Sequence, residues 1–152
     1  MKLKFIKKKF IEYCQKNKFD KNKNQIKIVD SLINFYDQKN SLFKYFLKKN
    51  KKLGFYLYGN VGVGKTMILN FFYKNLKISK QRFHFNEFMI MFHDFRHNNK
   101  ENSITKFVKK IKKKSKLIYF DEFQVTNIVD AMILGKLFEV IFKEKIIQFK
   151  FL

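Results

Sequence analysis

The segment from residue 59 to residue 67 has the pattern of a loop that binds phosphates. Glycines recur along the segment, and a lysine and a hydroxyl residue follow them. The residues of the segment are Gly59, Asn60, Val61, Gly62, Val63, Gly64, Lys65, Thr66 and Met67. Glycine lets the backbone turn tightly and approach a ligand closely, so that backbone N–H groups can face the phosphates. In this pattern the lysine reaches the β- and γ-phosphates and the hydroxyl binds Mg²⁺. We therefore expect these roles for Lys65 and Thr66.

The alternative is a glycine-rich turn that binds nothing. An apolar and aromatic segment, typical of a buried strand, precedes the loop at residues 53–58. Apolar residues at helical spacing follow it at residues 67–73. A strand, this loop and a helix in succession form the context in which the motif binds a nucleotide. The flanking segments therefore favour a site for ATP and Mg²⁺.

Two carboxylates follow a second apolar segment at residues 116–120. They are Asp121 and Glu122. Ligands of open parallel sheets bind at the carboxyl ends of strands, which is where this pair is expected. We predict that Asp121 holds Mg²⁺, directly or through water, and that Glu122 is catalytic, accepting a proton from the attacking water. A solvated acidic loop is the alternative, and the upstream phosphate loop argues against it.

The elements that must position these residues alternate along the chain. Further strands are expected at residues 82–85 and 145–152, and helices after the phosphate loop, from about residue 86, after Ser103 and at residues 127–142. Strands alternating with helices predict an α/β fold with a parallel sheet flanked by helices and joined by right-handed crossovers. We expect a helical N-terminal segment at residues 1–50, including a short helix after Ser41, and a P-loop core at residues 51–152, together forming one domain.

Composition excludes several classes of protein. The chain has 152 residues, of which 46% are hydrophobic and 18% aromatic, so it is not a disordered segment. No apolar run reaches the roughly 18 residues that a membrane span needs. A single cysteine, Cys14, excludes an internal disulfide and is typical of a reducing compartment. We expect a cytoplasmic protein without a transmembrane segment.

The net charge of +22 has two interpretations, and both stay open. The simpler interpretation is that the lysines lie on solvated faces, because an excess of lysine can reflect the base composition of the genome. The other is attraction to nucleic acid or to an anionic membrane surface, without sequence specificity. The densest basic stretch, residues 106–116, has Phe107, Val108 and Ile111 between its lysines. That spacing predicts an amphipathic helix on the sheet with its lysines in solvent.

Several segments together resemble one family of AAA+ ATPases. The resemblance rests on residues 54–59 with 65–67 and on residues 83–89 with His93 and His97. Its most distinctive part is residues 120–134, with the sequence FDEFQVTNIVDAMIL. The family comprises the bacterial cell-division ATPase ZapE and the mitochondrial "ATPase family gene one-like" proteins. The resemblance also places Asp20 and Gln25 at family positions ahead of the first strand, near the adenine.

The resemblance implies a P-loop NTPase fold of the AAA+ type and ATP hydrolysis coupled to work on protein partners. In bacteria it implies a link to the division ring at the membrane face. A homo-oligomer is one of the expected assemblies. Relatives continue past the fourth core strand into a sensor asparagine, an arginine finger, a fifth strand and a helical lid. We expect this chain to be truncated before them, with impaired hydrolysis and with the phosphate-loop strand at an exposed edge of the sheet.

Overall fold

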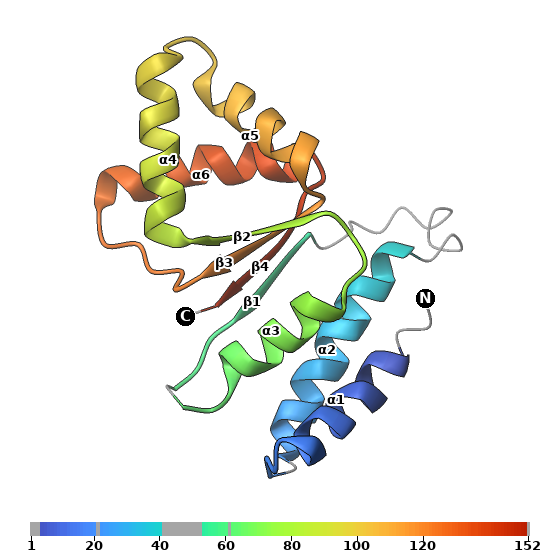
Figure 1. The fold of residues 1–152 in the computed structure, drawn as a ribbon. Helices are drawn as coiled ribbons and strands as arrows, with labels where there is room; N and C mark the ends of the chain where they lie inside the picture. The colour runs from blue at the N-terminus through green and yellow to red at the C-terminus, as the bar shows by residue number, and fades with distance from the viewer. Residues whose placement is uncertain (1–3, 21, 41–52, 61, 152) are drawn as a thin grey trace. The chain divides into compact units, whose positions relative to one another are not determined.

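The computed structural model describes residues 4–20, 22–40, 53–60 and 62–151 (Figure 1). The chain divides into two compact units. The first contains the described part of Met1–Lys52 together with Asn60–Leu76, and the second contains Leu53–Gly59 together with the described part of Lys77–Leu152. The described residues do not include Val61, the helix expected after Ser41, or the boundary expected between residues 50 and 51.

The first unit consists of α1 (Lys4–Lys16), α2 (Lys23–Asn40) and α3 (Lys65–Asn75). Its core forms from apolar residues that recur at helical spacing, such as Ile6, Phe10 and Cys14 on one face of α1. The ring of Phe10 meets that of Phe71 on α3 edge to face, with 5.2 Å between the ring centroids. This packing connects the N-terminal helices to the helix that follows the phosphate loop.

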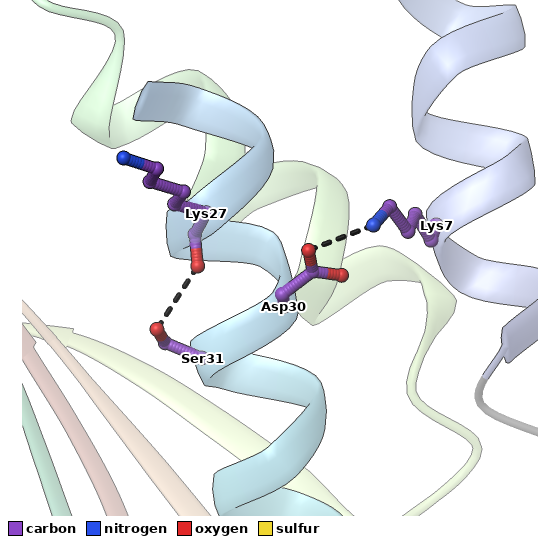
Figure 2. Close-up of polar contacts among 4 residues, drawn as sticks. All are labelled: Lys7, Lys27, Asp30 and Ser31. Carbon is purple, nitrogen blue, oxygen red and sulfur yellow. Dashed lines mark hydrogen bonds and ion pairs between the residues drawn. The ribbon is translucent and has the colours of Figure 1, made fainter. Parts of the chain in front are cut away.

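A polar contact also links α1 to α2, as Figure 2 shows. The Lys7 Nζ donates a hydrogen bond of 2.7 Å to Asp30 Oδ2. Within α2, Ser31 Oγ donates to the Lys27 carbonyl oxygen one turn earlier, at 2.9 Å. The Lys7 and Asp30 side chains are 42% and 40% exposed to solvent, so the ion pair contributes little free energy of folding.

The second unit contains β1 (Gly54–Leu57), β2 (Lys80–His84), β3 (Leu117–Asp121) and β4 (Ile147–Phe151). The helices between them are α4 (Phe85–Asn98), α5 (Ser103–Lys114) and α6 (Ile128–Lys143). The described strands form one parallel sheet in the order β1-β4-β3-β2. The α/β fold with a parallel sheet is therefore confirmed, and it is consistent with a P-loop NTPase.

An aromatic core fills the space between this sheet and the helices α4, α5 and α6, which lie on one of its faces (Figure 1). Phe88 of α4 meets Phe120 of β3 edge to face at 4.8 Å between centroids, and it meets Phe107 of α5 at 5.5 Å. Phe107, Val108 and Ile111 are all buried. The prediction that α5 is an amphipathic helix with its apolar residues inward is confirmed.

The strand before the phosphate loop differs from the expectation. It was predicted to be buried, yet its residues alternate between exposed and half-buried, and Tyr56 is 49% exposed. The reason is its place in the sheet, because among the described strands β1 pairs only with β4 and forms an edge. The predicted edge position of this strand is confirmed.

Two element boundaries also shift. Phe85 was expected to end β2 but is the first residue of α4, because its side chain turns into the core of the second unit. The last strand was expected from residue 145 but begins at Ile147, since Lys145 has a left-handed backbone conformation with φ of 57°. The asparagine expected to start α6 does so, with Asn127 Oδ1 accepting a hydrogen bond of 2.8 Å from the Val129 N–H.

A lysine lies on the aromatic side of β4. The Lys150 Nζ is 3.3 Å from the centroid of the Phe138 ring and 4.9 Å from that of Phe123. Burial lowers the pKa of Lys150 from 10.5 to about 8, although the ring faces attract the ammonium. At neutral pH the folded chain therefore holds a poorly solvated charge.

We expect Lys150→Met to raise the thermal midpoint at pH 7 and to lose most of that advantage by pH 10.5. The pKa of this lysine is lower in the folded than in the unfolded chain, so the folded chain binds fewer protons between about pH 8 and the ordinary lysine value of about 10.4. The free energy of unfolding of the unaltered protein should rise with pH across that window. Differential scanning fluorimetry of both proteins over the pH range measures the effect.

Lys109→Met is the matched control, because it removes an exposed lysine on α5. If the thermal midpoints of Lys150→Met and the unaltered chain change with pH in parallel, burial of the Lys150 charge does not destabilise the folded chain.

Candidate functional site

The phosphate loop has the backbone conformation that its glycines predict. Gly62 and Gly64 both have φ of +84°, in the left-handed region that other residues avoid. A Cβ added at Gly62 would meet nothing within 4 Å, so this part of the loop borders open space. A loop that bends in this way beside open space suits a group that lies close to the backbone.

Lys65 is the first residue of α3 and its side chain folds back over the loop. It is only 8% exposed, and its Nζ donates a hydrogen bond of 2.8 Å to the carbonyl oxygen of Asn60. The cap residue of α3, Gly64, has no side chain to accept bonds from the first turn, and that turn contains no acidic residue. A lysine ammonium and the positive end of a helix dipole therefore meet here, which favours an anion.

The rest of the motif lies beside this lysine. Thr66 is exposed and Met67 is half-buried at the start of α3, while Asn60 and Val63 are exposed in the loop. The Thr66 hydroxyl is thus accessible to a metal ion bound to phosphates. The glycine conformations, the open space beside Gly62 and the lysine together fit a nucleotide polyphosphate with Mg²⁺.

A residue from the N-terminal segment contacts the loop. The Gln25 Nε2 on α2 donates a hydrogen bond of 3.1 Å to the carbonyl oxygen of Val63. The same nitrogen would be 2.6 Å from a Cβ placed on Gly64, so Gln25 fills the space on that side of the loop. The resemblance singled out Gln25, and the structure adds its contact with the loop backbone.

The carboxylate pair lies at the carboxyl end of β3, as expected. Asp121 is buried and forms an ion pair with Arg82 of β2, between Nη2 and Oδ2. The Arg82 guanidinium also lies over the ring of Tyr119, 5.0 Å from its centroid. Burial raises the pKa of the Tyr119 hydroxyl, and the negative charge of Asp121 raises it further. Asp121 thus lies among partly buried groups, where it is paired with Arg82.

Arg82 did not emerge from the sequence as a functional residue. The one available signal was an arginine within a predicted strand, in a chain whose basic residues are mostly lysine. Its role depends on strand register, because β2 and β3 pair His84 with Asp121 and Arg82 with Tyr119. An arginine at that register can reach the carboxylate two positions farther along the neighbouring strand.

Glu122 lies in a strained turn directly after β3. Its backbone has φ of 50°, which is unusual for a residue with a side chain, and its own side chain is exposed. The turn is anchored by Phe123, whose ring meets that of Phe85 edge to face at 4.8 Å. Such strain costs of order 1–3 kcal/mol and persists where the surroundings enforce it, which is common at functional sites. The turn buries Asp121 and turns Glu122 outward.

The structure thus brings the predicted residues together in two groups. Lys65, Thr66 and Met67 lie together in the first unit, and Asp121 and Glu122 lie together in the second. The chemical roles assigned to these residues stay predictions.

We expect Arg82 and Asp121 to be energetically coupled by about 1.5–3 kcal/mol, the usual range for a hydrogen bond to a charged group. Arg82→Gln should destabilise the chain because it leaves the buried carboxylate without its cation. The same change made together with Asp121→Asn should cost much less. Urea unfolding of the two single variants and the double variant gives the coupling energy, and additive effects would show that the pair does not interact.

No helix among the described residues is long and apolar enough to cross a membrane. No solved structure matches the chain significantly. Among curated proteins it is similar to lactation elevated protein 1 homolog B of Danio rerio, with 41% identity over 63% of this chain and 22% of the relative. It is also similar to cell division protein ZapE of Escherichia coli, with 36% identity over 59% of this chain and 24% of the relative.

The chain therefore spans about a quarter of the length of these relatives. The AFG1-like ATPase family matches residues 6–148, nearly the whole chain. That match includes the phosphate loop, both carboxylates and Gln25. The chain belongs to the AFG1-like ATPase family.

Proposed function

We propose that the chain binds Mg-ATP at the phosphate loop and hydrolyses it, coupling hydrolysis to the remodelling of a protein partner in the cytoplasm. The observation that carries the proposal is the loop itself, with glycines at positive φ and the buried Lys65 folded across it. Membership of an ATPase family supports hydrolysis. The name of the relative ZapE supports cell division as the setting.

The roles follow from the chemistry of each group. Lys65 would neutralise charge on the β- and γ-phosphates, and the loop N–H groups would hold the remaining oxygens. Thr66 and Asp121 would hold Mg²⁺, which when bound withdraws charge from the phosphate oxygens. Glu122, turned outward by its left-handed backbone, would accept the proton of the attacking water.

Two other functions differ from this one in a measurable way. A nucleotide-binding module without turnover would use the same loop but not Glu122. A P-loop protein stimulated by nucleic acid would use the lysine surface of α5, where Lys109, Lys110 and Lys113 are exposed. The first predicts binding without hydrolysis, and the second predicts stimulation by single-stranded DNA that falls steeply with salt.

We expect Glu122→Gln to keep ATP affinity while lowering turnover by about 10²–10⁴-fold, the usual contribution of a general base. Lys65→Ala should lose ATP binding itself, because it removes the cation that the loop presents to the phosphates. ATP affinity from calorimetry and phosphate release at several protein concentrations test both variants. Turnover per chain that rises with concentration would indicate an active homo-oligomer.

Glu101→Gln is the matched control, since Glu101 is an exposed acid outside the carboxylate pair. ATP binding without turnover in the unaltered protein would favour the non-catalytic module. Equal turnover in Glu122→Gln and the unaltered protein would remove Glu122 from the mechanism.

A surface of the second unit supports a protein as the partner. At the start of α6, Ile128 is 79% exposed, Val129 55% and Met132 73%. Their spacing places them on one side of the helix. Val129 and Met132 also line a groove of about 370 Å³ that reaches α4 and α5. Exposed side chains of this kind, gathered at one place, are typical of protein interaction sites.

The charge of this groove indicates the kind of protein. Arg96, Lys100 and Lys136 line it, and no acidic residue is among its described lining residues. An apolar groove with a basic border is complementary to an amphipathic helix that carries acidic side chains. A second copy of this chain, at +22, is repelled by the same border. The groove lining exposes aliphatic side chains rather than rings on which bases could stack, which disfavours nucleic acid.

We expect a synthetic amphipathic helix with leucines on one face and glutamates on the other to bind the unaltered protein. Met132→Glu should abolish that binding, because it places a charge in the apolar part of the groove. Ile90→Glu is the control, since Ile90 is an exposed apolar residue of α4 outside the groove. Fluorescence anisotropy measures all three proteins against this peptide, its lysine-bearing counterpart and single-stranded DNA.

Equal binding of the glutamate and lysine peptides would contradict the assigned charge preference. Binding that persists in Met132→Glu would place the partner elsewhere. Single-stranded DNA bound through this groove in preference to the peptide would favour the nucleic-acid alternative.

A further inference from the structure

Gln25 lies outside the two nucleotide-binding motifs of the chain, at residues 59–67 and 116–122. It is the third residue of α2, and the start of that helix is well defined. The Asn22 Oδ1 accepts a hydrogen bond of 2.8 Å from the Asn24 N–H, and the Asn22 carbonyl oxygen accepts one of 3.2 Å from the Ile26 N–H. These bonds cap the helix, so the backbone of Gln25 has a fixed position in the first unit.

From this position the side chain reaches the phosphate loop. Its Nε2 donates the bond of 3.1 Å to the Val63 carbonyl oxygen, across 38 residues of sequence. Gln25 and the loop residues from Asn60 onward belong to the same unit. The contact is therefore part of the internal packing of that unit.

The consequence of this bond follows from peptide geometry. The described peptide bonds include no cis bond. In a planar trans peptide the C=O and N–H groups point in opposite directions. Gln25 holds the C=O of the Val63–Gly64 peptide on the side of α2, so it turns the Gly64 N–H to the opposite side, away from α2. Gly64 has φ of +84° and tolerates this orientation without strain.

We propose that Gln25 is a positioning residue of the phosphate loop, which holds the Val63–Gly64 peptide so that the Gly64 N–H is presented to a phosphate oxygen. This rests on the proposed binding of ATP at the loop. Gln25 acts through the backbone and not by touching the base, so its effect does not depend on the nucleoside. The proposal therefore replaces a position beside the adenine with one beside the phosphates.

The proposal also gives the N-terminal helices a part in nucleotide binding. α2 contacts α1 through the Lys7–Asp30 ion pair in Figure 2, and its Tyr36 ring meets that of Phe72 on α3 at 6.4 Å between centroids. A displacement of α2 moves the donor that orients the loop. Residues well before the motif thus determine the orientation of one of its N–H groups.

The test uses two ligands that share phosphates but differ in the base, namely ATP and inorganic tripolyphosphate, each with Mg²⁺. Gln25→Glu keeps the shape of the side chain but replaces the donor with a carboxylate oxygen, and Gln25→Ala removes the donor altogether. We expect Gln25→Ala to weaken both ligands by the same factor, about threefold to tenfold, which is what one hydrogen bond provides. Gln25→Glu should weaken both at least as much, since the carboxylate repels the Val63 oxygen.

Ser31→Ala is the matched control, because Ser31 is exposed on the same helix and its hydroxyl donates to the Lys27 carbonyl oxygen, away from the loop (Figure 2). It should leave both affinities unchanged, and calorimetry measures all variants with the thermal midpoint of each recorded. A loss for ATP but not for tripolyphosphate would overturn the proposal and place Gln25 at the base. Unchanged affinities in both Gln25 variants would also overturn it.

Failure of the proposed function gives a different result. If the unaltered chain binds neither ligand, or if Lys65→Ala binds both as well as the unaltered chain does, the loop is not a phosphate site and both proposals fall. If Lys65→Ala loses binding and the Gln25 variants do not, only the positioning role falls.

Discussion

The burial of β3 along its whole length is the constraint on which the second unit depends. Leu117, Ile118, Tyr119 and Phe120 are all inaccessible to solvent, since β3 lies between β4 and β2. A parallel strand in that place must be apolar on both faces. The first charged residue after it, Asp121, is still buried and therefore needs a cation, which Arg82 of β2 provides. The chain turns outward only at the next residue, so a buried and an exposed carboxylate become neighbours.

In the first unit, the phosphate loop also places a charged group out of solvent, and there the charge is positive. Lys65 is nearly buried at the positive end of α3, where a cation is unfavourable without an anion nearby. The Asn60 carbonyl oxygen offsets part of this, and a bound polyphosphate would offset far more. Lys65 with the Asn60 carbonyl oxygen and Asp121 with Arg82 are thus two buried charges, each of which has a polar or charged partner. Buried charges of this kind are common at functional sites.

The positive charge of the chain is distributed in two distinct ways. On α5 the lysines face solvent while Phe107, Val108 and Ile111 are buried, so they form an ordinary solvated helix face. In the groove between α4, α5 and α6, basic residues border exposed aliphatic side chains. Only the second arrangement combines shape, apolar surface and charge, which is why we propose the groove, rather than the lysine face, as the site for a protein partner. The family match gives no information on this choice, because it concerns the ATPase fold.

The sequence by itself determined the elements and the motifs. Helix and strand follow from apolar periodicity, and the phosphate loop and the carboxylate pair follow from residue types at fixed short spacings, so each is encoded within about ten residues. Only the tertiary structure decided that Arg82 pairs with Asp121 and that Gln25 bonds to the loop, contacts that span 39 and 38 residues. It also decided that β1 is half exposed rather than buried. These features depend on strand register and helix packing, which arise from many weak contacts between distant segments and leave no local pattern.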